Sequence, residues 1–98
     1  MDMTAKNQTT PNDRRTIEEI LQRDATFRYQ LLSRLKLDCN YYLGYGNRFP
    51  KCLWFGNEEL QIELMIELHN SFGEDEKPMW LTMEQIKAYS AQMTNDKN

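Results

Sequence analysis

The chain has 98 residues, a net charge of −3 and 40% hydrophobic residues, which is the size of one domain with one compact core. A deep substrate cavity is not expected in so short a chain, and no apolar run approaches the roughly 20 residues of a membrane span. The first residues also lack the apolar segment of a secretory signal, so we expect a cytoplasmic protein.

Residues 1–13 are polar and lack apolar periodicity, so we expect a disordered tail there. Thr16 and Glu19 have the spacing of a capping box, which predicts a short helix from Thr16 to about Arg23. Asp24 either caps a second helix or lies inside one continuous helix, and the pattern does not decide between them. We expect a single helical domain over 14–93 and a second disordered tail over 94–98.

A longer helix is predicted over Ala25–Leu43. At 100° per residue its apolar side chains fall in one arc of about 160°, which is a core-facing stripe. The stripe consists of Phe27, Leu31, Leu32, Leu35, Cys39, Tyr42 and Leu43. Arg28 interrupts the stripe, and Gly44 stands where a left-handed helix cap is expected. Tyr29, Leu37 and Tyr41 lie off the stripe, so they are candidates for an apolar partner-binding surface.

The segment Tyr41–Asn57 combines glycines with large rings, unlike a flexible linker. We expect a long ordered loop between the two main helices, with the ring of Trp54 closing one end of the core. Tyr45 and Phe49 complete the apolar partner-binding candidates. The sequence leaves open whether the aromatic side chains of the loop belong to the core or to an interface.

A third helix is predicted from Glu58 to Phe72, capped by Asn57 and ended by Gly73. Its apolar arc covers about two-thirds of the circumference, so this helix should be the central one. Glu59, Glu63 and Glu67 form a polar ridge at helical spacing, expected to be solvated.

An exposed acidic turn follows at Glu74, Asp75 and Glu76. Thr82 and Gln85 form a second capping box, which begins a fourth helix that continues to about Met93. No strand pattern is present, so the fold class is all-α: a compact domain of three to four helices.

No residue pattern predicts catalysis or a bound metal. Cys39 and Cys52 form no zinc motif, Cys39 lies in the core stripe, and the one histidine, His69, points away from the glutamate ridge. No nucleotide-binding glycine motif is present. We therefore expect a non-enzymatic protein with no cofactor and no small-molecule substrate.

The charge is distributed unevenly along the chain. Residues 14–51 hold eight Lys/Arg and four Asp/Glu, whereas residues 57–87 hold two and eight. A nucleic-acid-binding module that uses Arg34, Lys36, Arg48 and Lys51 is one hypothesis, because these cations accompany aromatic rings. The pI of about 5.1 is far from that of a dedicated nucleic-acid binder.

Four runs of residues resemble one family: RYQLLSRLKLDCNYYLGYGN (28–47), LWFGN (53–57), QIELMIELHNSF (61–72) and PMWLTMEQIKAY (78–89). This family is the large polyvalent protein-associated domain, type eleven, and the resemblance covers roughly Phe27–Tyr89. Its members are small helical modules, found alone or within very large proteins of phages and conjugative elements. The family supplies no established reaction to transfer, and Phe49, Pro50 and Cys52 depart from its usual pattern.

The resemblance implies a mobile-element protein that acts inside a bacterial host. Such a protein is expected to bind a host protein, for example a defence nuclease, and to inhibit a defence system in the manner of an anti-CRISPR protein. By analogy, acidic side chains would replace phosphates in a basic groove. The candidates for that role are Glu59, Glu63, Glu67, Glu74, Asp75 and Glu76. A nucleic-acid-binding accessory module of a phage or conjugative element is the alternative.

Overall fold

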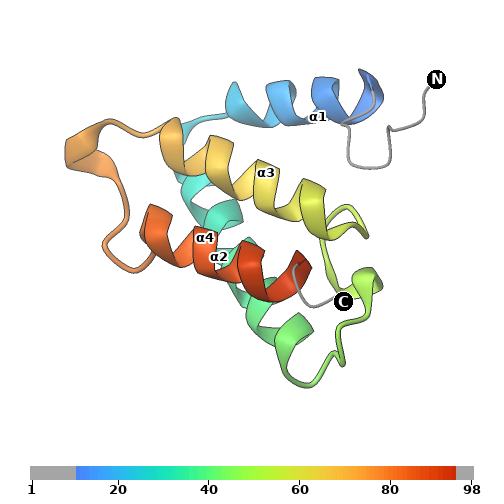
Figure 1. The fold of residues 1–98 in the computed structure, drawn as a ribbon. Coiled ribbons are helices and arrows are strands. Elements are labelled where there is room, and N and C mark those ends of the chain that lie inside the picture. Colours follow the sequence, from blue (N-terminus) through green and yellow to red (C-terminus); the bar gives the residue numbers. More distant parts are fainter. Residues whose placement is uncertain (1–10, 95–98) are drawn as a thin grey trace.

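A computed structural model, which describes residues 11–94, shows four α-helices and two short 3-10 helices and no strand in that range. The predicted all-α fold is confirmed. The elements are α1 (Pro11–Leu21), α2 (Ala25–Leu43), η2 (Pro50–Cys52), α3 (Glu58–Asn70), η3 (Glu74–Glu76) and α4 (Met83–Thr94). Figure 1 shows α3 between α1 on one side and α2 and α4 on the other, and α3 contacts all three.

The first helix starts earlier than the capping box predicts. Because α1 begins at Pro11, Thr16 lies inside the helix, and the expected tail is wrong for Pro11–Asp13. The second tail is wrong for Thr94, which is the last residue of α4, and residues 1–10 and 95–98 of the two tails lie outside the described residues. The structure also decides the role of Asp24: its Oδ1 accepts a hydrogen bond of 2.8 Å from the Phe27 amide, so it caps a separate helix.

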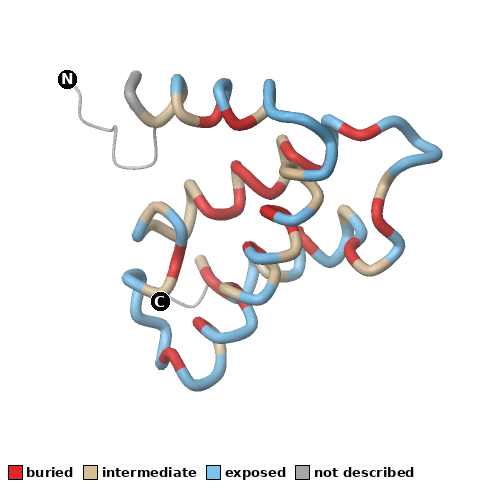
Figure 2. Tube along the Cα trace, turned by 180° about the vertical axis from the view of Figure 1, so that it is seen from behind, coloured by how far each residue is buried: buried red, intermediate tan, exposed pale blue. Residues whose placement is uncertain are grey.

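The core is built around α3, whose Leu64, Met65 and Leu68 are fully buried. The stripe of α2 faces them, with Leu32, Leu35 and Cys39 completely covered; Figure 2 shows buried segments along both helices. Burial of one such leucine side chain contributes about 1.5–3 kcal/mol to stability. The apolar faces of helices far apart in sequence therefore hold the domain together.

The predicted caps at Asn57 and Thr82 are confirmed, whereas those at Gly44 and Gly73, like the one at Thr16, are wrong. Asn57 Oδ1 accepts the Leu60 amide at 2.9 Å, and Thr82 and Gln85 exchange both bonds of a capping box, at 2.9 and 3.1 Å. Gly44 is not left-handed, with φ −112°. The third helix ends at Asn70 without using Gly73 as a cap, because Ser71 closes its last turn in a right-handed conformation.

Candidate interaction surface

Five large apolar side chains are exposed at the end of the molecule formed by α2 and the loop 44–57. Tyr45 is 91% exposed, Phe49 66% and Trp54 44%, and Leu37 and Tyr41 on α2 are also exposed. We call these five residues the aromatic surface. Among residues 11–94, Met79 is the other exposed large hydrophobic residue, and it belongs to a different connector. Such a concentration of exposed rings is typical of a contact surface.

Backbone hydrogen bonds fold the first half of the loop against the end of α2. The Gly46 amide donates to Tyr41 O at 2.7 Å, and the Arg48 amide donates to Tyr42 O at 2.8 Å. Asn47 and Arg48 adopt the left-handed conformation, with φ 53° and 63°. A Cβ at position 46 would lie only 2.8 Å from Cys52 Sγ, so the chain requires glycine where the two halves of the loop meet.

The second half of the loop is anchored through backbone atoms and the aliphatic side chain of Leu53, which is buried. The Trp54 amide donates to Gln61 Oε1 at 2.9 Å, and Gln61 Nε2 donates to Leu35 O at 3.1 Å. Because the anchor is the amide of Trp54, its ring is left at the surface. The prediction that this ring closes the core is therefore wrong.

Gln61 was missed by the sequence analysis although it is fully buried on α3. Its amide group joins the loop 44–57 to α2, and a buried polar group needs such partners to offset its desolvation. A signal was present, because Gln61 stands within the apolar arc of its helix rather than on the glutamate ridge.

Tyr29 does not belong to the exposed set. Its ring makes edge-to-face contacts with Phe72 at 5.3 Å and with Trp80 at 5.4 Å between ring centroids. These contacts join α2 to the connector that precedes α4. The expectation of a partner-binding role for Tyr29 is replaced by a packing role.

The glutamate ridge is largely covered by α1, contrary to the expectation of a solvated face. The Arg14 guanidinium donates to Glu67 at 2.6 and 2.8 Å and to Glu63 at 3.0 Å. The hydrogen bond from Arg14 lowers the pKa of Glu67, against the opposing effect of burial. Two of the three ridge carboxylates thus have a cation of this chain beside them.

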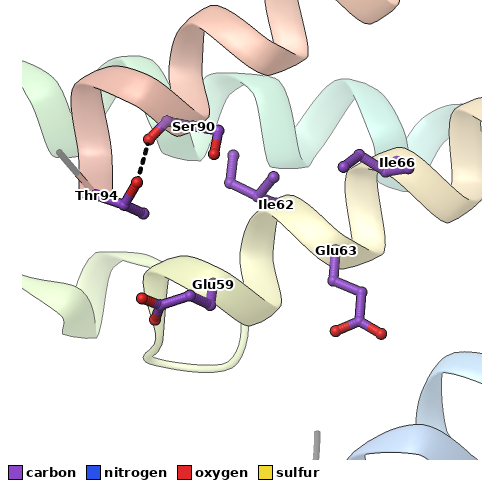
Figure 3. Close-up of a pocket in the computed structure, with 6 residues that line it drawn as sticks. All are labelled: Glu59, Ile62, Glu63, Ile66, Ser90 and Thr94. Atoms are coloured by element: carbon purple, nitrogen blue, oxygen red, sulfur yellow. Dashed lines mark hydrogen bonds between the residues drawn. The ribbon is translucent and has the colours of Figure 1, made fainter. Parts of the chain in front are cut away.

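Glu59, the third member of the ridge, borders a groove of about 490 Å³ between α3 and α4. Figure 3 shows Ile62 and Ile66 directed toward α4, whereas Glu63 points toward α1. On the α4 side the Thr94 hydroxyl donates to Ser90 O at 2.7 Å. The groove is open and mixed in polarity, with carboxylates and hydroxyl groups beside two isoleucine side chains.

The acidic turn lies at the other end of the molecule from the loop 44–57 (Figure 1). Glu74, Asp75 and Glu76 are exposed in η3. The neighbouring Lys77 ammonium donates to His69 O at 2.9 Å and to Phe72 O at 2.6 Å, so it is directed inward, away from the carboxylates. The three negative charges therefore face solvent together.

The four cations of the nucleic-acid hypothesis are not brought together as one phosphate-binding set. Lys36 Nζ donates to Trp80 O at 3.0 Å, and the Arg48 guanidinium donates to Gln92 O. Arg34 forms an i,i+4 ion pair with Asp38 at 3.4 Å. Lys51 is exposed beside the aromatic surface. Two of these side chains thus join a connector to a helix of the fold.

Cys39, Cys52 and His69 are the side chains that the sequence analysis considered for catalysis or metal binding. Burial raises the pKa of the Cys39 thiol to about 12, and Cys52 is a half-buried free thiol in the loop. The buried His69 ring uses Nε2 to contact Leu81 O at 3.1 Å. Within the part of the chain that the structure describes, no group of three metal-ligating side chains is present.

The fold places the chain in the class of small all-α domains. The sequence model of one family, Large polyvalent protein-associated domain 11, matches residues 25–93, and the chain belongs to this family. The domain is one associated with phages and mobile elements. The match covers α2 to α4 and leaves α1 outside.

No curated protein and no solved structure matches the chain. No helix among residues 11–94 is long and apolar enough to cross a membrane.

Proposed function

We propose that this chain is a non-enzymatic module of a mobile element that binds a host protein through the aromatic surface. One observation carries the proposal: a single loop exposes a tyrosine, a phenylalanine and a tryptophan side chain, and its backbone is hydrogen-bonded to α2 and α3. These are the residue types that most often dominate binding energy in protein interfaces. A loop already folded in the free protein loses less conformational entropy on binding.

Inhibition of a bacterial defence system, in the manner of an anti-CRISPR protein, is the concrete form of this proposal. It is supported by the family's association with phages and mobile elements and by the small size of the chain. The place of action would be the cytoplasm of a bacterial host. Phosphate mimicry by the acidic side chains depends mainly on the turn at Glu74–Glu76, because Arg14 already pairs with Glu63 and Glu67.

Affinity purification from the bacterium that carries the protein tests this proposal. The surface variant combines Leu37→Ser with Phe49→Ser, and a matched variant neutralises the turn with Glu74→Gln, Asp75→Asn and Glu76→Gln. We expect the parent and the turn variant to capture the same host protein and the surface variant to lose it, while all three unfold at similar temperatures. The purified parent should also inhibit the activity of the captured protein.

The opposite pattern would contradict the proposal. If the surface variant keeps the partner and the turn variant loses it, the acidic turn is the contact and phosphate mimicry gains support. If the protein captured is bound only through nucleic acid and is released by nuclease treatment, the accessory nucleic-acid module is the better function.

A further inference from the structure

We infer that the partner segment that docks on the aromatic surface is acidic and carries an apolar anchor side chain. This inference rests on the proposed function and specifies the chemistry of the partner. The first observation is one of composition: residues 41–57 contain Arg48 and Lys51 and no aspartate or glutamate. In a chain of net charge −3, the loop that displays the rings is locally positive.

The carboxylates that flank this segment are turned to internal partners. Asp38, one turn before Tyr42, accepts from Arg34 at 3.4 Å. Glu58, the first residue of α3, accepts a hydrogen bond of 2.5 Å from the Tyr42 hydroxyl. The charge of Asp38 is thus offset by Arg34, whereas Glu58 keeps its charge, and the Arg48 guanidinium is directed to Gln92. The positive character of the surface therefore rests on Lys51, which is exposed. Electrostatic complementarity then favours a partner surface of negative charge.

A small pocket of about 380 Å³ lies within the positive segment. It is lined by Phe49, Pro50, Lys51 and Gly56, so its walls are an aromatic ring, a proline ring and the aliphatic stem of a lysine. Gly56 adopts φ 66°, a left-handed conformation that other residues rarely take, and it leaves this wall without a side chain. A pocket of this kind accepts one apolar side chain, which a neighbouring carboxylate can follow to reach the Lys51 ammonium.

A protein segment fits this surface better than a nucleic-acid strand. A strand needs a track of cations along its phosphates, whereas Lys36 and Arg48 are directed to carbonyl groups of the fold. The glutamates of α3 and the acidic turn would also repel a long polyanion. A short acidic peptide segment needs charge complementarity only with the loop 44–57.

Selection from a random dodecapeptide library displayed on phage tests the inference on the full chain. Peptides are selected on the parent protein and counter-selected on the Phe49→Ala variant. We expect the enriched peptides to share an aromatic or aliphatic anchor beside aspartate or glutamate. A synthetic copy of an enriched peptide should bind Lys51→Glu at least about fivefold more weakly than the parent. Lys87→Glu, the same charge reversal on α4, should bind it like the parent.

The other possible results would each contradict either the acidic character of the partner or the docking surface itself. Enriched peptides that need Phe49 but are neutral or basic, or that bind Lys51→Glu as well as the parent, overturn the acidic partner and leave the docking surface standing. Absence of enrichment over the counter-selection removes both. Tighter binding of an oligothymidylate than of any enriched peptide, with loss in Lys51→Glu, assigns the surface to single-stranded nucleic acid instead.

Discussion

The two connectors that join the core helices, 44–57 and 71–82, place their aromatic side chains in opposite ways. The first leaves Tyr45, Phe49 and Trp54 exposed. The second buries Phe72 and packs Trp80 edge-on against Tyr29. Both connectors contain large aromatic side chains and both precede a capped helix. The presence of aromatic residues in a connector therefore does not by itself determine whether their rings are buried.

The difference comes from what each connector uses as its anchor. Loop 44–57 is held by backbone hydrogen bonds, by Leu53 and by the partly buried ring of Phe55, so its three exposed rings are not its anchors. Connector 71–82 is instead anchored by its aromatic side chains. Both Phe72 and Trp80 pack edge-to-face against the ring of Tyr29 on α2. Rings that the fold does not use are available for a partner, and this is the basis of the functional proposal.

The largest expected effect separates the two connectors directly. Phe72→Ala should lower the free energy of unfolding by about 3–5 kcal/mol, because it removes a buried ring and leaves a cavity. Phe49→Ala makes the same chemical change on the exposed loop and should cost less than about 1 kcal/mol. Urea unfolding followed by circular dichroism measures both. Equal losses in the two variants would mean that loop 44–57 also contributes its rings to the core.

The next effect concerns the buried anchor of loop 44–57. Gln61→Ala leaves the Trp54 amide without its partner and removes a second hydrogen bond from the Leu35 carbonyl, so it should destabilise the protein by about 2 kcal/mol. Hydrogen exchange should then accelerate at Trp54 more than at Glu76, whose amide donates to Gly73 O at 2.9 Å in the other connector. Thr94→Ala, which removes a hydroxyl bond at the end of α4, is a control expected to leave exchange at Trp54 unchanged. Unchanged protection at Trp54 in Gln61→Ala would contradict the anchor.

A smaller effect is expected at the end of connector 71–82. Thr82→Ala removes one half of the capping box that starts α4 and should cost about 1 kcal/mol. Thr82→Ser keeps the hydroxyl and should restore most of that stability. Thermal unfolding curves that coincide for Thr82→Ala and the parent would show that the cap contributes nothing measurable.

The smallest effect tests a contact outside both connectors, between α1 and α3. Arg14 lowers the pKa of Glu67 in the folded protein, so the pair contributes stability above the ordinary glutamate value of 4.5 and loses it as the pH falls through the lowered value. Arg14→Gln should therefore be less stable than the parent by up to about 1 kcal/mol near neutral pH. The two proteins should converge once the pH lies below that lowered value, where Glu67 is protonated in both. A difference that persists in acid would indicate a packing effect instead.

Much of the fold follows from local signals in the sequence. The range Ala25–Leu43 matches α2, and the caps at Asn57 and Thr82 are correct, because helix period and capping depend on neighbouring residues. The early start of α1 was missed since Pro11–Asp13 contains no apolar residue to reveal a helix. Such polar first turns carry no periodic signal.

The exposure and pairing of surface side chains were harder to predict, because the residues that contact them are distant in the sequence. Trp54 and Trp80 each precede a helix, and only the position of Tyr29 makes one of them a packing residue. Arg14 and Glu67 are 53 positions apart in the sequence, so the residues next to each of them do not indicate this ion pair. Exposure of Leu37 and Tyr41, by contrast, followed from their place off the helix stripe.

Photo-crosslinking most directly tests the claim that loop 44–57 is the contact surface. A benzophenone amino acid is placed at Phe49 in one variant and at Met79, which is 95% exposed in connector 71–82, in the other. In cells that carry the protein, irradiation should give a discrete adduct with one protein from position 49 and none from position 79. No adduct at position 49, or the same adduct from both positions, would contradict the account.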